Sequence, residues 1–471
     1  MVFASITFLF LFLPANLLLY YLFRKPEHRN SVLIAFSFAF YAWGEPIWVG
    51  LLFLSASVDY VHGLLVERYR GTRWERAPVV SSIVINIGLL VAFKYSGFLY
   101  ETINGVFGSS FEVPNFTLPI GISFYTFQTI SYVVDVYRGE VKAQRSYGKF
   151  LMFVSLYHQL VAGPIVRYAT IAKEVDDRRE SLRDVVAGIH RFSIGLFKKV
   201  CIANVAGELV ARYMDADPSA LTMGESWIGL LMFSLQIYYD FSGYSDMAIG
   251  LGQMFGFHYL ENFRHPYIAQ TATDFWRRWH ISLGTFFRDY VYIPLGGNRR
   301  HPIRNLFIVW GLTGLWHGAS WNFILWGLYF GALIFLERVA LTRILGALPR
   351  AVSHGYLLVV AYFGWALFYF TDLSQLGSYL SVMFGSNDHI LVSAELSTVL
   401  REHLYWLALA VLGCVPIYDA LRDRLRVAAA DSVVGQRWIG VGMMAMNLAM
   451  ITVATTMLVG RSYNPFLYFR F

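Results

Sequence analysis

Residues 305–336 read NLFIVWGLTGLWHGASWNFILWGLYFGALIFL, an apolar run in which His317 is the one acidic or basic side chain. An apolar run of this length is typical of a chain inside a lipid bilayer. An ionisable side chain at membrane depth is costly, and it usually marks an ion path, a proton relay or a catalytic site. A histidine also exchanges a proton near neutral pH, as a general base must. His317 is therefore the strongest functional candidate in the sequence.

The length of this run predicts a helical hairpin. Arg304 and Arg338 are both expected on the cytoplasmic side, and 33 residues (305–337) separate them. Two full crossings with a turn need on the order of 40 residues, so we expect an incomplete hairpin with His317 near its apex, roughly 20 Å from Arg304 along a helix. One long tilted span is the competing geometry. Two small and two polar residues fit a tight apex that lines a wet cavity: Gly314, Gly318, Ser320 and Asn322.

The composition indicates that the chain is embedded in a membrane almost throughout. Of its 471 residues, 56% are hydrophobic and only 15% are charged, which is less charge than soluble domains carry. Because the apolar runs are continuous, a helical bundle is favoured over a barrel, and we predict one all-α integral-membrane domain over residues 1–471. The net charge of +7 is spread over short loops, which the positive-inside rule explains and which argues against a nucleic-acid partner. The two cysteines, Cys201 and Cys414, are expected to be inert packing residues.

The charges of the loops predict a topology. Loops rich in Lys and Arg alternate along the chain with loops that have few or none. This alternation fits roughly eleven transmembrane helices with Met1 on the periplasmic side. Residues 3–23 lack a basic start and a cleavage motif, so we expect a span there and not a cleaved signal. Residues 150–168 are apolar but have basic residues on both flanks, which predicts a re-entrant or interfacial segment broken at Gly163-Pro164. Residues 258–304 are basic and aromatic and are expected on the cytoplasmic face.

A polar patch interrupts another apolar span at residues 238–247. Its two carboxylates, Asp240 and Asp246, are unusual at membrane depth. Together with Ser242 and Tyr244 they are candidates for a polar cavity wall, or for an acid that orients a base. A buried network that only fixes helix packing is the alternative, and the sequence leaves both open.

Arginines stand among tryptophans in residues 274–300. Such arginines are candidates to hold the phosphates of an anionic donor. Composition alone favours the alternative, an aromatic and basic belt at the membrane interface that needs no ligand. No pair of histidines and no Cys/His cluster has metal-ligand spacing, so we predict no metal site. The candidate arginines are Arg277, Arg278, Arg288, Arg299 and Arg300.

Several motifs resemble, in order, the signatures of the membrane-bound O-acyltransferase (MBOAT) family, closest to its bacterial alginate O-acetyltransferase branch. They are DFSGYSD (240–246), FWRRWHIS (275–282), YIPLGGN (292–298) and WHGA (316–319). The opening MVF (1–3), LPIGISF (118–124), AGPI (162–165) and the closing NPFLYFRF (464–471) are similar to that branch as well. The resemblance therefore covers nearly the whole chain, and several ordered motifs together are specific.

The resemblance implies an acyltransferase of the bacterial inner membrane, with its helices around a central tunnel. In that family the histidine of the WHG motif, His317 here, is essential, and the histidine of the WRRWH motif, His280 here, is the usual second site residue. Acetyl-CoA is the expected donor and would dock from the cytoplasm. His317 would act as general base on a hydroxyl that arrives from the other face, and His280 or Asn322 would stabilise the oxyanion. Because the thioester is already activated, we expect no bound cofactor and no role for a protein cysteine.

The C-terminal motif carries one further expectation from the resemblance. Related export systems use a C-terminal tyrosine as an acyl relay on the outer face, which implies that role for Tyr468. A periplasmic partner protein would then complete transfer to a polysaccharide acceptor. The alternative is that the tail is only an interfacial aromatic belt made of Tyr463, Phe466, Tyr468 and Phe469.

Two other functions remain open at this point. A D-alanyl transferase of the teichoic-acid type would take its acyl group from a carrier protein, although IPLGGN and WHGA look more like the acetyltransferase branch. A proton-coupled transporter would use His317 and the intramembrane acids as a proton path, but the sequence shows no two-half repeat. Alginate, cellulose and peptidoglycan all remain possible acceptors.

Overall fold

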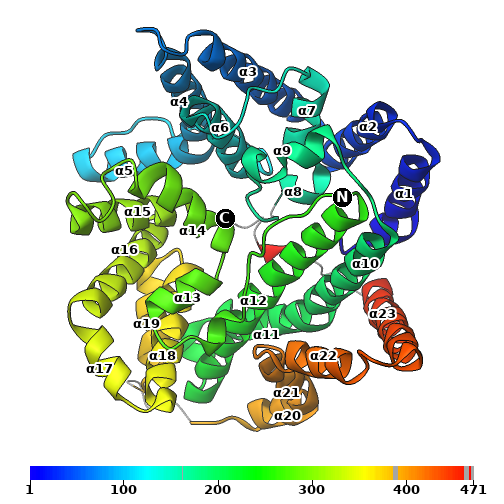
Figure 1. Cartoon of the computed structure of the whole chain (residues 1–471). Coiled ribbons are helices and arrows are strands. Elements are labelled where there is room, and N and C mark those ends of the chain that lie inside the picture. Colours follow the sequence, from blue (N-terminus) through cyan, green and yellow to red (C-terminus); the bar gives the residue numbers. More distant parts are fainter. Residues whose placement is uncertain (162, 386–390, 461–465, 468–471) are drawn as a thin grey trace. The chain divides into compact units, whose positions relative to one another are not determined.

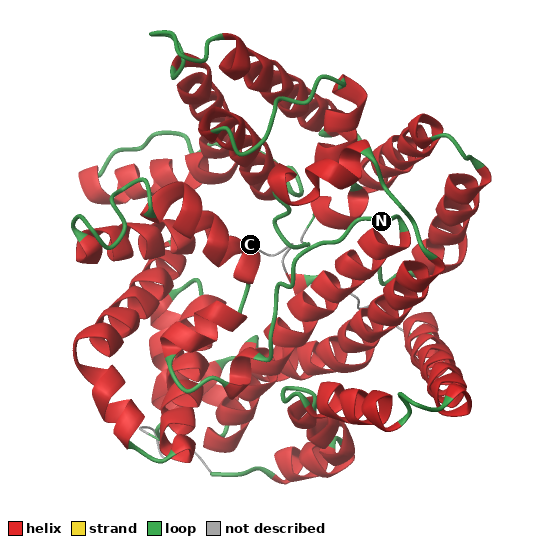
Figure 2. Cartoon of the chain, viewed as in Figure 1, coloured by secondary structure: helices red, strands yellow, loops and turns green. Residues whose placement is uncertain are grey.

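The computed structural model describes residues 1–161, 163–385, 391–460, 466 and 467, and within these residues it contains helices and no strand (Figures 1 and 2). The prediction of an all-α chain is confirmed. Five helices are long and apolar enough to cross a membrane, or six if the bent pair α21–α22 forms one span. The higher count expected from the loop charges is not confirmed, because some expected spans are too short for this test, such as the 17 residues of α6 (Ile122–Arg138).

The chain divides into two compact units. The first comprises Met1–Phe192 and Tyr244–Leu260, and the second comprises Ser193–Gly243 and Glu261–Phe471. Two helices, α10 (Leu182–Phe197) and α12 (Met223–Met254), have residues in both units. Nothing in this division tests whether residues 1–471 act as one domain, so that remains a prediction.

The first unit contains the segment that was expected to be re-entrant, residues 150–168. No single long helix forms there, as predicted. α7 has only nine residues, α8 has four, and the helix breaks at Leu156, earlier than the expected Gly163-Pro164.

The helices of this unit are α1 (Leu13–Leu22) after the π-helical turn η1 (Phe8–Phe12), α2 (Pro26–Gly44), α3 (Val49–Arg68), α4 (Ala77–Leu90), η2 (Val91–Tyr95), α5 (Ser96–Phe107), α6, α7 (Tyr147–Ser155), α8 (Tyr157–Leu160), α9 (Tyr168–Asp176) and most of α10.

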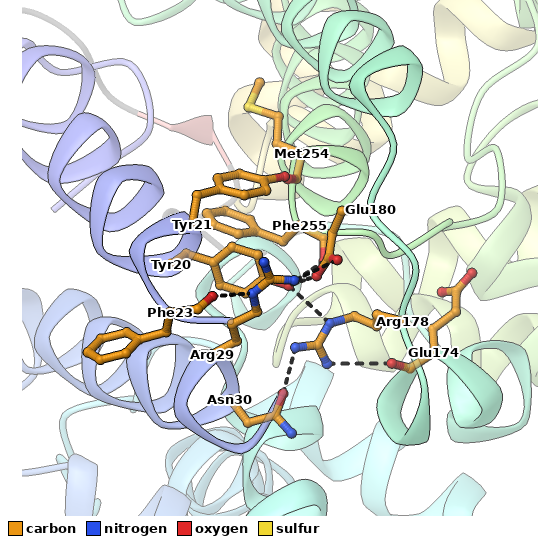
Figure 3. A network of polar contacts seen from close by, with 10 residues as sticks. All are labelled: Tyr20, Tyr21, Phe23, Arg29, Asn30, Glu174, Arg178, Glu180, Met254 and Phe255. Atoms are coloured by element: carbon orange, nitrogen blue, oxygen red, sulfur yellow. Dashed lines mark hydrogen bonds and ion pairs between the residues drawn. The ribbon is translucent and has the colours of Figure 1, made fainter. Parts of the chain in front are cut away.

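A polar network ties the ends of several helices of this unit together (Figure 3). Glu180, between α9 and α10, accepts a hydrogen bond from Tyr20 Oη at 2.5 Å and pairs with Arg29 Nη1 at 2.8 Å. Arg178 Nη2 donates to Asn30 Oδ1 at 2.5 Å. Arg29 and Arg178 thus join α1 and α2 to the α9–α10 connection.

The second unit holds an aromatic core, which includes fully buried Trp326, Trp365 and Tyr379. The first part of the long helix α12, up to Gly243, also contributes to this core. The other helices of this unit are η3 (Lys198–Ala203), α11 (Asn204–Met214), η4 (Pro218–Ala220), η5 (Pro266–Ile268), α13 (Ala272–Arg278), α14 (Ile281–Phe287), η6 (Arg288–Tyr292), α15 (Pro302–His317), α16 (Trp321–Leu336), η7 (Glu337–Leu341), α17 (Thr342–Ala347), α18 (Arg350–Tyr369), α19 (Leu373–Met383), α20 (Ala394–Glu402), α21 (Leu404–Leu412), α22 (Ile417–Ala428) and α23 (Val433–Val459).

The apolar run that carries His317 folds as a helical hairpin, as predicted. α15 ends at His317, three residues turn the chain, and α16 begins at Trp321. The second arm is longer than expected, because α16 continues through η7 and α17 to Ala347, which makes 27 helical residues. Only α15, with 16 residues and a length of roughly 24 Å, is too short for a full crossing.

Glycines bring the backbones of the two arms into contact. A Cβ atom on Gly314 would lie 2.2 Å from the carbonyl oxygen of Phe323, and one on Gly327 would lie 2.2 Å from that of Trp310. Both distances are shorter than real Cβ contacts, so these positions accept only glycine without movement of the backbone. Since residue 314 meets 323 and residue 327 meets 310, the arms run antiparallel.

Gly314→Ala is expected to lower the melting temperature of the purified protein, because the added methyl group forces α15 and α16 apart. The expected cost is about 1–3 kcal/mol, which is typical of overpacking. The matched control is Gly311→Ala in the same helix, where a Cβ atom would meet nothing within 4 Å. That variant should be as stable as the native chain or more stable, since alanine favours helix. Equal melting temperatures for the two variants would contradict the close packing.

Candidate active site

His317 lies at the end of α15 among aromatic rings. Its side chain is buried, with 6% exposure for the residue. The imidazole centroid lies 4.9 Å from the ring of Trp326 and 5.2 Å from that of Phe368, in both cases edge to face. The next residue, Gly318, is extended, and a Cβ atom there would lie 2.2 Å from the ring of Phe323. Packing therefore fixes the end of α15 and, with it, the position of the imidazole.

A small cavity of about 20 Å³ lies beside His317. This volume holds roughly one water molecule. Segments that are far apart in the sequence meet at it: α12, the residue that follows α13, the hairpin, α18 and the C-terminal segment. Besides His317, its wall includes Asp240, Trp279, Trp326, Trp365, Phe368 and Leu467.

A second, larger cavity of about 240 Å³ lies in the same unit and contains His280. Its wall is mostly apolar, with Arg288 and Tyr292 among the polar contributors. Trp279 lines both cavities. The two histidines that the resemblance singled out therefore belong to neighbouring cavities, with one indole ring in the wall of each.

A buried carboxylate positions α13, the helix that leads into Trp279 and His280. Glu337, in the η7 part of the second arm of the hairpin, accepts the backbone N–H of Ala272 at 2.5 Å and that of Thr273 at 2.9 Å. The first N–H groups of a helix have no partner within the helix, and the helix dipole favours a negative charge there. Glu337 thus holds the start of α13 against the second arm of the hairpin.

The backbone and the ring of His280 are both held in unusual states. The residue has φ 45° and ψ 53°, a left-handed conformation that is uncommon for a bulky side chain and often marks a functional site. Its Nδ1 lies 3.2 Å from Asn262 Oδ1, and the backbone N–H of Ser282 donates to that same oxygen at 3.1 Å. Because the oxygen must accept both bonds, Nδ1 carries the proton and Nε2 carries a lone pair.

The environment of His280 keeps this ring neutral. The residue lies outside the candidate membrane spans, and burial lowers its pKa to about 3. Its Nε2 atom is buried and has no hydrogen-bond partner among the residues that the structure describes. His280 is therefore suited to accept a hydrogen bond in the larger cavity, and in this tautomer Nε2 does not donate to an oxyanion.

Asn322, the other expected oxyanion donor, holds the end of a neighbouring helix. It is fully buried in the first turn of α16. Its Nδ2 group donates to the carbonyl oxygens of Leu367 at 3.1 Å and Phe368 at 3.4 Å. Both amide hydrogens are thus used to place the end of α18, whose Phe368 ring contacts His317. This geometry favours a positioning role for Asn322.

Asp240 joins a buried ion pair to the C-terminal segment. Its Oδ1 atom lies 2.5 Å from Lys199 Nζ, and both side chains are almost completely buried. Its Oδ2 atom accepts the backbone N–H of Leu467 at 2.7 Å. Phe466 and Leu467 in turn line the cavity of His317. Asp240 thus lines this cavity and also belongs to a buried polar network, the two roles that the sequence left open. Tyr468, the expected relay, lies outside the described residues.

The other members of the 238–247 patch are placed differently. The Ser242 hydroxyl is buried without a hydrogen-bond partner in the described part of the chain, and Ser242 does not line the His317 cavity. In the first unit, Tyr244 stacks on Phe3 with ring centroids 4.6 Å apart, and Asp246 pairs with Arg191 at 2.6 Å. For Tyr244 and Asp246 this geometry favours packing, and their role in a cavity stays a prediction.

The five candidate arginines lie in different environments. Arg288 lines the larger cavity and pairs with Asp289 at 2.6 Å. Arg278 pairs with Asp274 at 3.0 Å, one helical turn earlier. Their role in binding a donor stays a prediction for all five. Four of them are exposed: Arg277, Arg288, Arg299 and Arg300.

Three residues at this site were not singled out from the sequence. Lys199 had a usable signal, because a lysine at membrane depth normally pairs with an acid and Asp240 needed such a partner. Glu337 looked like a loop charge, since nothing local links it to α13. Trp326 was one aromatic among many in an apolar helix, and only the packing brings it to His317.

Residues 142–380, which include the hairpin, both histidines and the larger cavity, match the MBOAT, membrane-bound O-acyltransferase, family. The chain belongs to the MBOAT family. This confirms the resemblance seen in the motifs and makes the protein a multi-pass membrane acyltransferase.

Known proteins are similar to this chain over different lengths. It is 37% identical to the probable alginate O-acetylase AlgI of Pseudomonas putida, with 100% of both chains covered. It is 36% identical to the peptidoglycan O-acetyltransferase of Helicobacter pylori, over 70% of this chain and 69% of that one. It is 30% identical to the teichoic acid D-alanyltransferase of Bacillus subtilis, over 46% of this chain and 58% of that one.

The buried pair at this site gives a test that separates stability from activity. Asp240→Ala leaves Lys199 as an uncompensated buried charge and is expected to cost about 3–5 kcal/mol of folding stability. The double variant Lys199→Met, Asp240→Leu replaces the pair by apolar side chains and should regain most of that stability. Its acyl transfer should stay low, because the N–H of Leu467 has still lost its acceptor. Thermal unfolding and an acyl-transfer assay measure the two effects, and a double variant as unstable as the single one would contradict this account.

Proposed function

We propose that this protein is an O-acetyltransferase of the bacterial inner membrane. It takes acetyl groups from acetyl-CoA on the cytoplasmic side and delivers them outward for O-acetylation of an exopolysaccharide or a cell-wall glycan. The names of the relatives support this choice, since the match to an alginate O-acetylase runs over the whole chain. The match to the D-alanyltransferase covers less than half of it. Transfer from free acetyl-CoA with no carrier protein present would distinguish the two donors.

The observation that carries the proposal is the pair of neighbouring cavities. The larger one, with Arg288 in its wall, suits the thioester arm of a CoA donor, whose phosphates an arginine can bind. The smaller one, beside His317, is matched to a group of the size of an acetyl methyl and not to a long acyl chain. Because Trp279 lines both, a thioester carbonyl at this ring lies at the boundary between donor arm and base.

The reaction then needs few groups. His317 removes the proton of an acceptor hydroxyl as the oxygen attacks the thioester carbonyl. The C–O bond forms, and the tetrahedral intermediate carries the negative charge on the former carbonyl oxygen. When it collapses, the C–S bond breaks and the thiolate of CoA takes the proton from His317. The products are an acetyl ester and free CoA, with no bound cofactor or protein thiol.

The C-terminal segment supplies a candidate for the first acceptor. Phe466 and Leu467 line the His317 cavity, and Asp240 anchors the backbone of Leu467 there. We therefore retain Tyr468 as the acyl relay, whose phenol would pass the acetyl group to a periplasmic partner and then to polysaccharide. In this scheme Met1 is periplasmic, in agreement with the loop charges.

His317→Ala is expected to reduce acetyl transfer about 100-fold or more, because 100-fold is the lower end of the rate enhancement that a general base contributes. The assay uses purified protein in proteoliposomes with labelled acetyl-CoA and follows label on the glycan or the partner. The matched control is His28→Ala, at an exposed histidine in the first turn of α2. Equal transfer by His317→Ala and by the native protein would refute the mechanism.

Tyr468→Phe is expected to abolish acetylation of the polysaccharide, because phenylalanine has no hydroxyl to carry the acetyl group. The control is Tyr463→Phe, which removes the hydroxyl of the neighbouring tail tyrosine and should leave acetylation intact. The readout is the acetyl content of polysaccharide from cells that carry each variant. Undiminished acetylation with Tyr468→Phe would exclude the relay role of Tyr468 and would favour the alternative, an interfacial aromatic belt.

A further inference from the structure

The proposed reaction builds up negative charge on the thioester oxygen, and the side chains first expected to stabilise it are committed elsewhere. Asn322 uses both amide hydrogens on the carbonyl oxygens of Leu367 and Phe368. His280 donates through Nδ1 to Asn262 and lines the larger cavity, not the one beside His317. The oxyanion therefore needs another donor close to His317.

Trp326 has the properties of that donor. It stands one helical turn after Asn322 on the buried face of α16 and is completely buried. Its ring lines the cavity of His317, with the two ring centroids 4.9 Å apart and the planes at 81°. Its indole Nε1–H is buried and has no hydrogen-bond partner among residues 1–161, 163–385, 391–460, 466 and 467.

A buried donor without a partner is costly, so native proteins rarely keep one without a function. Trp365, in the wall of the same cavity, shows the usual solution: its Nε1–H donates to Tyr267 Oη at 3.0 Å. Trp326 lacks such a partner although rings surround it closely, among them Trp276 at 5.4 Å and Phe330 at 5.5 Å. This packing fixes the indole in place, which is what preorganised electrostatic catalysis requires.

We infer that Trp326 is a catalytic residue whose indole N–H donates a hydrogen bond to the oxyanion of the tetrahedral intermediate. The inference rests on the proposed acetyl transfer at His317 and adds the group that stabilises its charge. The indole N–H gains its partner when the carbonyl oxygen becomes negative, so the interaction is stronger in the transition state than in the bound thioester. No bond of Trp326 is made or broken, and the proton stays on the indole.

The test removes this N–H and keeps the shape of the side chain. Replacing Trp326 by β-(3-benzothienyl)alanine, through an expanded genetic code, puts sulfur where the N–H was. We expect kcat for acetyl transfer from acetyl-CoA to fall about 100-fold or more, as when other oxyanion donors are removed. KM for acetyl-CoA should change less than about threefold, because the lost interaction belongs to the transition state. Incorporation at exposed Trp438 in α23 is the control and should leave both constants unchanged.

Two outcomes would overturn the inference: an unchanged kcat, or a raised KM at unchanged kcat, which would make Trp326 a donor-binding residue. If the native protein itself transfers no acetyl group, the proposed function fails, and the inference that rests on it fails with it. An active native protein with an unaffected variant refutes the inference alone.

A second measurement uses the native side chain, in case the variant does not fold. The ketone analogue S-acetonyl-CoA should shift the Nε1–H resonance of Trp326 downfield in nanodiscs, and a bound analogue with no shift also contradicts the inference. The resonance is assigned by its absence in Trp326→Phe.

Discussion

The active site depends on the backbone contact between the two arms of the α15–α16 hairpin. Gly314 and Gly327 allow this contact, since a Cβ atom at either would meet a carbonyl oxygen of the opposite arm at 2.2 Å. The contact stops α15 at His317 and places Trp326 of the second arm beside it. A wider hairpin would leave a gap at the imidazole, and the aromatic wall that excludes water would be lost. The chemistry therefore follows from a steric requirement for small residues at two positions of an apolar helix pair.

Buried charges then fix the other elements around this hairpin. Glu337 holds the start of α13, and the Lys199–Asp240 pair holds the C-terminal segment. A buried ion pair adds little net stability compared with apolar packing, because desolvation offsets its attraction. The role of this pair is to position the C-terminal segment, because Asp240 accepts the backbone N–H of Leu467 in a cavity wall that is otherwise apolar. These buried charges thus position the elements that surround the His317 imidazole.

Much of the site could be predicted from the sequence, for identifiable reasons. The hairpin follows from the distance between Arg304 and Arg338, and His317 stands out because it is ionisable within an apolar run. The sequence motifs identified the family and indicated the two histidines of the site. The number of spans was harder to predict, because loop charges do not show whether a short helix such as α6 is long enough to cross the membrane.

The donors and anchors of the site could not be predicted in this way. Asn322 looked like a cavity residue because it is polar, yet its amide is used to hold α18. Trp326 looked like a packing residue because it is aromatic, yet its N–H is a buried donor in the His317 cavity wall that has no partner among the described residues. Such roles depend on which hydrogen bonds are already made, and that information exists only in three dimensions.

A cryo-EM structure of the native protein with S-acetonyl-CoA bound tests the central claim most directly. The account predicts density for the CoA arm in the cavity of His280, with the ketone carbonyl at Trp279 and within contact of the His317 imidazole. Density for the analogue at another place, with the His317 cavity still closed and water-sized, would contradict it.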